Sequence, residues 1–156
     1  FDHFAFWIAK IGYLFMMIVL PIYLLGFVEW LVGFLILSMS AGLILSIVFQ
    51  LAHTVEETAF PIPEENNKIE NEWAIHQLET TANFATKSKL ISWLVGGLNF
   101  QIEHHLFPKI SHVHYPAISK IIKNTCEEFG IKYIEYKKMR HAIVSHALYL
   151  KRMGRA

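Results

Sequence analysis

The feature that most constrains this chain is a pair of long uncharged stretches in its first third. No residue from Ile11 to Val28 is charged, and none is charged from Leu31 to Ala52. As an α-helix the second stretch would be about 33 Å long, against about 30 Å for the hydrocarbon core of a bilayer. Neither stretch has the polar face that a buried helix of a soluble protein normally shows. The sequence therefore predicts two membrane-spanning helices, over about residues 4–26 and 31–52.

A short link joins the two predicted spans, from Gly26 to Glu29, so we expect an antiparallel transmembrane hairpin. Of the 14 Lys and Arg residues, Lys10 precedes the hairpin and all the others lie at Lys68 or beyond. Because basic segments next to a span stay in the cytoplasm, both ends of the hairpin are predicted to face that side. Small residues along the second span indicate that further helices pack against it. We therefore expect an integral, multi-pass membrane protein.

The chain beyond the hairpin is polar, and its apolar residues recur at helical spacing. The sequence thus predicts an all-α membrane protein with a transmembrane hairpin, 1–56, followed by a mainly helical cytoplasmic or interfacial cap, 57–156. Within the cap we expect helices over about 71–86, from Pro116 to Phe129 and over Lys137–Met153, with an interfacial segment over Leu90–Phe100.

The overall charge and the two ends of the sequence set further limits. With 14 basic and 13 acidic side chains, the formal net charge of +1 gives no reason to expect a nucleic-acid partner. The single cysteine, Cys126, can form neither an internal disulfide nor a cysteine-rich zinc site. The sequence begins at Phe1 and shows no signal peptide, so we expect the C-terminal part of a longer protein.

Histidines are the residues that carry chemistry here, and there are nine of them. The spacing of Gln101, His104 and His105 brings three potential metal ligands to one side of a helix. Imidazole suits zinc, copper, iron and nickel, so the spacing alone does not name the ion. His53 directly follows the second uncharged stretch, at a depth where an ionisable residue is a functional candidate. The alternative for His53 is a structural histidine at a helix end.

The histidine-rich stretch carries a family resemblance. Gln101 to His105, followed by Leu106-Phe107-Pro108, resembles the third histidine box of membrane fatty acid desaturases. Gln in place of a leading His is similar to the front-end desaturases, which insert a double bond between an existing one and the carboxyl end. The chain looks most similar to the linoleoyl-type acyl-CoA or acyl-lipid desaturases. Three further stretches support the resemblance: Phe49 to His53, Gln77 to Asn83 and Gly97 to Phe100.

This resemblance implies a site of two non-haem iron ions held mainly by histidines at the cytoplasmic face. His104 and His105 would be direct iron ligands, and His53 would be a further ligand, so that these three form the catalytic set. Gln101 would lie at or beside the metals, while His76 would be a ligand, a neighbour of a ligand or a surface residue. The earlier histidine boxes of the family are absent from the 156 residues. We expect the missing N-terminal half of the protein to supply them, and this chain alone to be inactive.

The function implied by the resemblance belongs to lipid metabolism. It is the O₂-dependent conversion of CH₂–CH₂ to CH=CH in a long acyl chain, carried as acyl-CoA or acyl-lipid. Membrane lipid and an external electron donor such as cytochrome b5 or ferredoxin would be its partners. The alternatives are a di-iron lipid hydroxylase of the same superfamily and a non-catalytic membrane fragment that binds a metal or haem.

Other polar residues allow two interpretations each. Carboxylates could orient the imidazole rings or be solvated surface charges: Glu56, Glu57, Glu79 and Glu103. His112 and His114 could approach the substrate or be residues of a local turn. The basic residues Lys120, Lys123, Lys137, Lys138 and Arg140 could meet anionic lipids, a phosphate-bearing thioester or an acidic electron donor, or form a solvated face.

Overall fold

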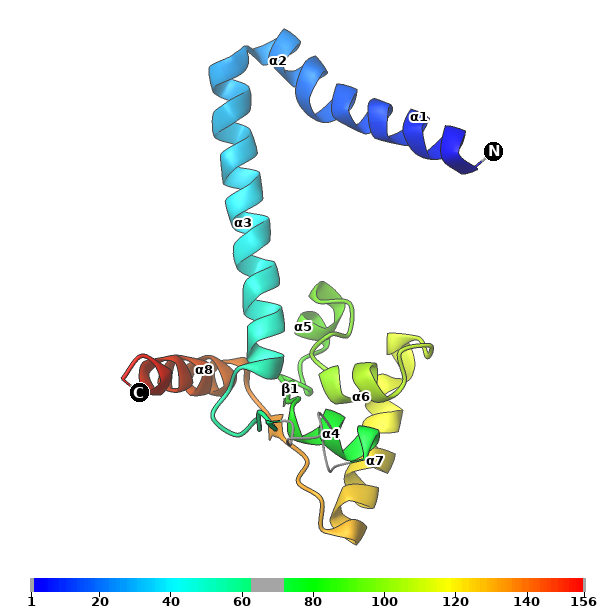
Figure 1. Ribbon diagram of the computed structural model, residues 1–156, viewed down its shortest axis with the longest axis vertical. Helices are drawn as coiled ribbons and strands as arrows, with labels where there is room; N and C mark the ends of the chain where they lie inside the picture. The colour runs from blue at the N-terminus through cyan, green and yellow to red at the C-terminus, as the bar shows by residue number, and fades with distance from the viewer. Residues whose placement is uncertain (1, 63–71, 156) are drawn as a thin grey trace. The chain divides into compact units, whose positions relative to one another are not determined.

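The computed structural model describes residues 2–62 and 72–155, and the chain divides into two compact units, Phe1–Leu45 and Ser46–Ala156. The described residues are mainly helical, which confirms the coarse fold class (Figure 1). The exception is a parallel pair of two-residue strands in the second unit. The predicted domain limits, 1–56 and 57–156, stay a prediction, since the division into units falls inside a helix.

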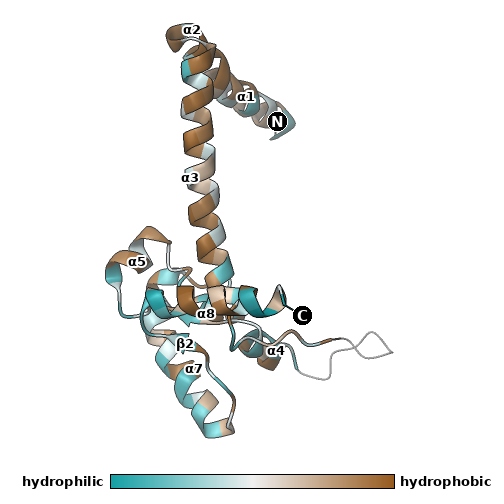
Figure 2. Cartoon of the chain, turned by 90° about the vertical axis from the view of Figure 1, so that its left-hand side faces the viewer, coloured by the Kyte–Doolittle hydropathy of each residue, from teal (hydrophilic) through white to brown (hydrophobic). Residues whose placement is uncertain are grey.

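The first unit holds the apolar helices. Helix α1 (Asp2–Leu14) continues through a π-helical turn, η1 (Phe15–Val19), into α2 (Leu20–Leu25), and α3 (Phe27–His53) follows. By length and composition, Asp2–Leu25 and Phe27–His53 could each cross a membrane, with mean hydropathy of 2.1 and 2.5. Their side chains are almost all exposed, and Figure 2 shows apolar residues over most of α3. Helices that expose apolar side chains in this way are suited to lipid rather than water.

The link between these helices is shorter than predicted. Gly26 alone separates α2 from α3, whereas the sequence predicted a link from Gly26 to Glu29. Gly26 has a φ of 97°, which an L side chain rarely adopts, so one residue suffices to end α2. Trp30 Nε1 donates a hydrogen bond to the Met17 carbonyl at 2.8 Å and thereby joins α3 to η1 close to the turn.

The second unit begins with the last turns of α3. Val48, Leu51 and Ala52 are buried there, together with Phe84, Ala85 and Ala142. The end of α3 is therefore packed against the rest of this unit, and His53, its last residue, is half-buried there. Eight elements follow α3 in the described part of the unit: α4 (Trp73–Glu79), β1 (Asn83–Phe84), α5 (Lys89–Leu94), α6 (Gln101–Leu106), η2 (His112–His114), α7 (Tyr115–Phe129), β2 (Glu135–Tyr136) and α8 (Met139–Met153).

Helix α4 is shorter than the predicted helix over residues 71–86, of which Asn71 lies outside the described residues. The helix ends at Glu79, and the backbone N–H and the hydroxyl of Thr80 both bond to the His76 carbonyl in its last turn. The next residues turn outward to partners far away in sequence. Ala82 N–H donates to the Ala52 carbonyl at 2.7 Å, and β1 pairs with β2 in parallel. Tertiary hydrogen bonds have overridden the local helical pattern here.

Two predicted helices are confirmed near the end of the chain. Helix α7 has Pro116 in its first turn and ends before Gly130, and α8 closely matches the predicted amphipathic helix. The α8 residue His146 donates from Nδ1 to the Thr54 carbonyl at 2.6 Å, because a carbonyl can only accept. This bond attaches α8 to the segment that follows α3.

The turn that leads into α6 depends on Gly97. Its φ is 78°, and a Cβ at this position would lie 2.5 Å from His112 Cβ. Gly97 N–H bonds to the Ser92 carbonyl, and its own carbonyl accepts from Phe100 N–H, one residue before α6. A side chain at Gly97 would therefore displace the start of the histidine-bearing helix.

We expect Gly97→Ala to destabilise the protein more than Gly96→Ala. Both glycines have positive φ, which costs an alanine about 1–2 kcal/mol, but only at Gly97 would the methyl group also clash, adding about 1–3 kcal/mol. Thermal unfolding in detergent, followed by tryptophan fluorescence, measures the difference. Equal midpoints for the two variants would contradict the clash.

Candidate metal centre

Three of the four predicted histidine ligands lie together where the end of α3 approaches α6. The ring centroids of His53 and His105 are 5.0 Å apart, and those of His104 and His105 are 5.9 Å apart with the planes at 84°. His53 reaches this place from the last residue of α3, so the apolar helix itself delivers an imidazole to the site. The short helix α6 supplies the other two.

One ring nitrogen of each of these histidines is already engaged. His105 Nδ1 is 2.7 Å from Gln77 Oε1, His53 Nδ1 is 3.3 Å from the Thr80 carbonyl, and His104 Nδ1 is 3.2 Å from the Tyr115 hydroxyl. Carbonyl oxygens only accept, so the Nδ1 atoms of His53 and His105 carry the proton. Their Nε2 atoms then present lone pairs, which is the arrangement in which imidazole binds a metal.

The environment keeps His105 neutral. Burial, and to a smaller extent repulsion from the neighbouring His53 and His104, lowers its pKa from 6.5 to about 4. A neutral imidazole is the form that binds metals, and His105 has this form at any pH well above 4.

Gln101 and His76 have buried polar atoms with no hydrogen-bond partner among the residues that the structure describes. Gln101 is 2% exposed, its Nε2 lies 3.5 Å from His53 Nε2, and its Oε1 has no partner. His76 is half-buried in α4, and its Nδ1 has none either. Buried polar atoms are normally satisfied, so a bound ion or an ordered water would complete both residues.

The donors fit a histidine-bound iron in kind but do not form a complete site. Imidazole nitrogens with their other ring nitrogen hydrogen-bonded are typical ligands of iron. Yet within residues 2–62 and 72–155, no three His, Cys, Asp or Glu side chains are grouped so that they could hold one metal ion. Further ligands would have to come from elsewhere.

A buried carboxylate anchors the helix that carries His104 and His105. Glu103 is fully buried; its Oε2 accepts from Asn83 Nδ2 at 2.7 Å and its Oε1 from the Tyr133 hydroxyl at 2.8 Å. Asn83 Oδ1 also accepts from Ile102 N–H, and Ser119 bonds to the Tyr133 hydroxyl. Burial raises the pKa of Glu103, while the bonds from Asn83 and Tyr133 oppose that change. This network ties α6 to β1, α7 and the segment before β2.

The interpretation of Glu103 as a solvated surface charge is therefore wrong, and its partners are Asn83 and Tyr133 rather than an imidazole. Glu57, by contrast, is exposed and paired with Lys132 at 3.2 Å. Sequence reasoning assigned no role to Gln77, Asn83, Tyr115 or Tyr133. The signal for Gln77 and Asn83 was present, since both belong to a stretch that resembles the family, but nothing local indicated what they would contact.

Comparison with known proteins identifies the class to which this fold and these histidines belong. The family model "Fatty acid desaturase" matches residues 2–137, so the chain belongs to the fatty acid desaturase family. Proteins of this family are generally di-iron and O₂-dependent.

Its relatives are named as desaturases, two of them as linoleoyl-lipid or acyl-lipid desaturases. The chain is 46% identical over 129 residues to the sn-1 linoleoyl-lipid 6-desaturase of Synechocystis, covering 82% of this chain and 36% of the relative. It is 38% identical over 149 residues to the acyl-lipid (8-3)-desaturase of Mortierella alpina, covering 96% and 33%. The chain thus spans about a third of the length of these relatives. No solved structure matches it.

We expect Tyr133→Phe to destabilise the protein by about 1–3 kcal/mol, since the change removes a donor from the buried carboxylate of Glu103. Tyr23→Phe, at a side chain that is 85% exposed, is the matched control and should have little effect. Chemical unfolding in mixed micelles measures both. An unchanged midpoint for Tyr133→Phe would mean that this hydrogen bond contributes nothing to stability.

The free energy of unfolding of the metal-free protein should rise with pH between about 4 and 6.5 through His105. In this range the unfolded state binds a proton at His105 that the folded state does not, because the folded pKa is about 4. His105→Gln should flatten the profile, whereas His141→Gln, at an exposed residue, should leave it unchanged. Parallel profiles for all three proteins would contradict the lowered pKa.

Proposed function

We propose that this chain forms part of an O₂-dependent membrane desaturase that acts on a long acyl chain. The observation that carries the proposal is the meeting of His53, His104 and His105, each with Nδ1 engaged by a neighbouring group. The membership of the family and the names of the relatives support it.

His53, His104 and His105 would hold iron through Nε2, and His76 and Gln101 would complete the site with their unpartnered atoms. Gln77, Thr80 and Tyr115 would fix the ring orientations. The family centre has two irons and the described residues contain no complete group of ligands, so polypeptide outside these residues would provide the remaining ligands.

The reaction removes two hydrogens from neighbouring CH₂ groups and, with O₂, two electrons and two protons, yields CH=CH and two waters. No general base of attainable pKa removes hydrogen from an unactivated CH₂, and the bound irons would supply that oxidising chemistry. The protein residues would keep the imidazoles neutral and hold the acyl chain so that one CH₂–CH₂ pair lies next to the site.

The proposal also covers the orientation in the membrane, the substrate and the electron donor. Asp2–Leu25 and Phe27–His53 would cross the membrane, with the second unit on the cytoplasmic face, because all but one of the basic residues lie beyond the second helix. An acyl-lipid substrate is favoured over acyl-CoA by the names of the relatives. The electrons would come from an external carrier such as cytochrome b5 or ferredoxin.

Replacing His104 or His105 by Ala should abolish iron loading and product formation together. The variants are made in a full-length protein of the family that carries these 156 residues, with His141→Ala on α8 as the control that keeps both. Iron is measured by mass spectrometry of the purified protein, and product by mass spectrometry of the lipids. Full turnover by either variant would contradict the role of these histidines.

The same lipid analysis separates the proposed activity from its alternatives. A product that has lost two hydrogens supports desaturation, whereas one that has gained an oxygen supports a hydroxylase. A Soret band in the purified protein would instead indicate haem and would contradict the desaturase proposal.

A further inference from the structure

A cavity in the second unit, Ser46–Ala156, is lined by lysines. Its volume is about 380 Å³, within the roughly 300–1,000 Å³ usual for small-ligand pockets. Phe100 and Pro116 give it an apolar wall, and Thr86 and Ser119 add hydroxyl groups. Four lysines line it from three segments of the chain: Lys87, Lys120, Lys123 and Lys137.

The positive charge of this cavity is only partly neutralised. Among the described residues, Glu135 is the one carboxylate in its lining; it pairs with Lys123 at 2.8 Å and also accepts a hydrogen bond from Thr86. Burial raises the pKa of Glu135, but the bonds from Lys123 and Thr86 lower it by more. The pKa therefore lies below its ordinary value, and the Glu135 carboxylate is ionised. Four ammonium groups against one carboxylate leave an excess of about three positive charges.

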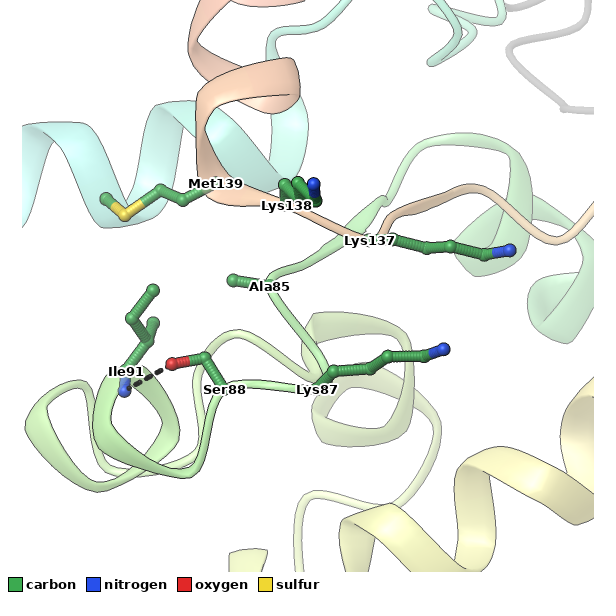
Figure 3. A pocket seen from close by; sticks show the side chains of 7 residues that line it. All are labelled: Ala85, Lys87, Ser88, Ile91, Lys137, Lys138 and Met139. Atoms are coloured by element: carbon green, nitrogen blue, oxygen red, sulfur yellow. Dashed lines mark hydrogen bonds between the residues drawn. The ribbon is translucent and has the colours of Figure 1, made fainter.

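These lysines come from different segments of the chain, so the fold brings them together; they are not neighbours along one solvent-exposed helix. Lys87 follows β1 and Lys137 follows β2, and the two strands run in parallel, so the residues after both strands emerge at the same end of the pair. Figure 3 shows the Lys87 and Lys137 side chains extending in the same direction. Lys123 is fixed from α7 by Glu135 and lies over the Tyr133 ring at 5.7 Å from its centre.

An adjoining cavity gives the lysines an apolar neighbour. It has a volume of about 450 Å³ and shares Lys87 and Lys137 with the first cavity. Figure 3 shows Ile91 and Met139 on the side away from the ammonium groups of these two lysines. A ligand with one anionic end and one apolar end would suit this pair of cavities.

We propose that the cavity lined by Lys87, Lys120, Lys123 and Lys137 binds the phosphate group of an anionic ligand. Ammonium groups are strong donors to phosphate oxygens, and the Thr86 and Ser119 hydroxyls add neutral donors. The phosphate comes either from a lipid headgroup or from a soluble phosphate compound, which share this chemistry. The proposal does not depend on the histidine site or on its metal.

The test compares two double variants of the protein purified in an uncharged detergent at low ionic strength. K87Q/K120Q removes two exposed lysines of the cavity, and K109Q/K151Q removes two exposed lysines that do not line it. The probes are inorganic phosphate and short-chain phosphatidic acid, with short-chain phosphatidylcholine as the zwitterionic control lipid. Isothermal titration calorimetry gives the affinities, and circular dichroism checks that both variants are folded.

We expect the unsubstituted protein to bind at least one anionic probe and K87Q/K120Q to bind it about tenfold more weakly, while K109Q/K151Q changes less than about twofold. Binding of inorganic phosphate points to a soluble source, and binding of phosphatidic acid alone points to a lipid headgroup. The proposal is overturned if the unsubstituted protein binds neither probe, or if K87Q/K120Q loses no more affinity than K109Q/K151Q.

Discussion

The hydrogen bonds of Glu103 hold the histidine-bearing helix in place. A six-residue helix has too few internal bonds to be stable alone, so α6 must take its position from its surroundings. Asn83 and Tyr133 bond to the two carboxylate oxygens of Glu103, and Asn83 also accepts from the backbone N–H of Ile102. An unpaired carboxylate at this depth would cost several kcal/mol, so the network either forms completely or opposes folding. The directions of His104 and His105 follow from it.

The other half of the site depends on α3. In its last turns Val48, Leu51 and Ala52 are buried in the second unit, and the His53 ring lies beside that of His105 on α6. The packing of these last turns positions His53, and the Thr80 carbonyl, 3.3 Å from Nδ1, then fixes its ring. The turn after α4 thus has two roles: it ends that helix and it orients a histidine.

The sequence predicted the features that come from composition and short-range spacing. The two apolar helices, the amphipathic α8, and α7 between Pro116 and Gly130 all follow from local patterns. It failed where residues distant in sequence decide the structure: α4 ends at Glu79 because Ala82 and Asn83 bond to Ala52 in α3 and to Ile134 before β2. The burial of Glu103 was hidden for the same reason, since its partners Asn83 and Tyr133 are 20 and 30 residues away. The ligand roles of the histidines stay a prediction, whereas their proximity is a property of the fold.

A path of hydrogen bonds links the lysine-lined cavity to Glu103, the residue before His104. Ser119, which lines that cavity, bonds to the Tyr133 hydroxyl; Tyr133 bonds to Glu103, and His104 is the next residue in the chain. The proposed phosphate site and the proposed metal site thus share one anchor but consist of different residues. Because Glu103 is buried away from water, a change in charge at the lysines or at the histidines would act on its carboxylate with little screening. Its firm attachment to Asn83 and Tyr133 limits how far it can move in response, so both surfaces keep their shape.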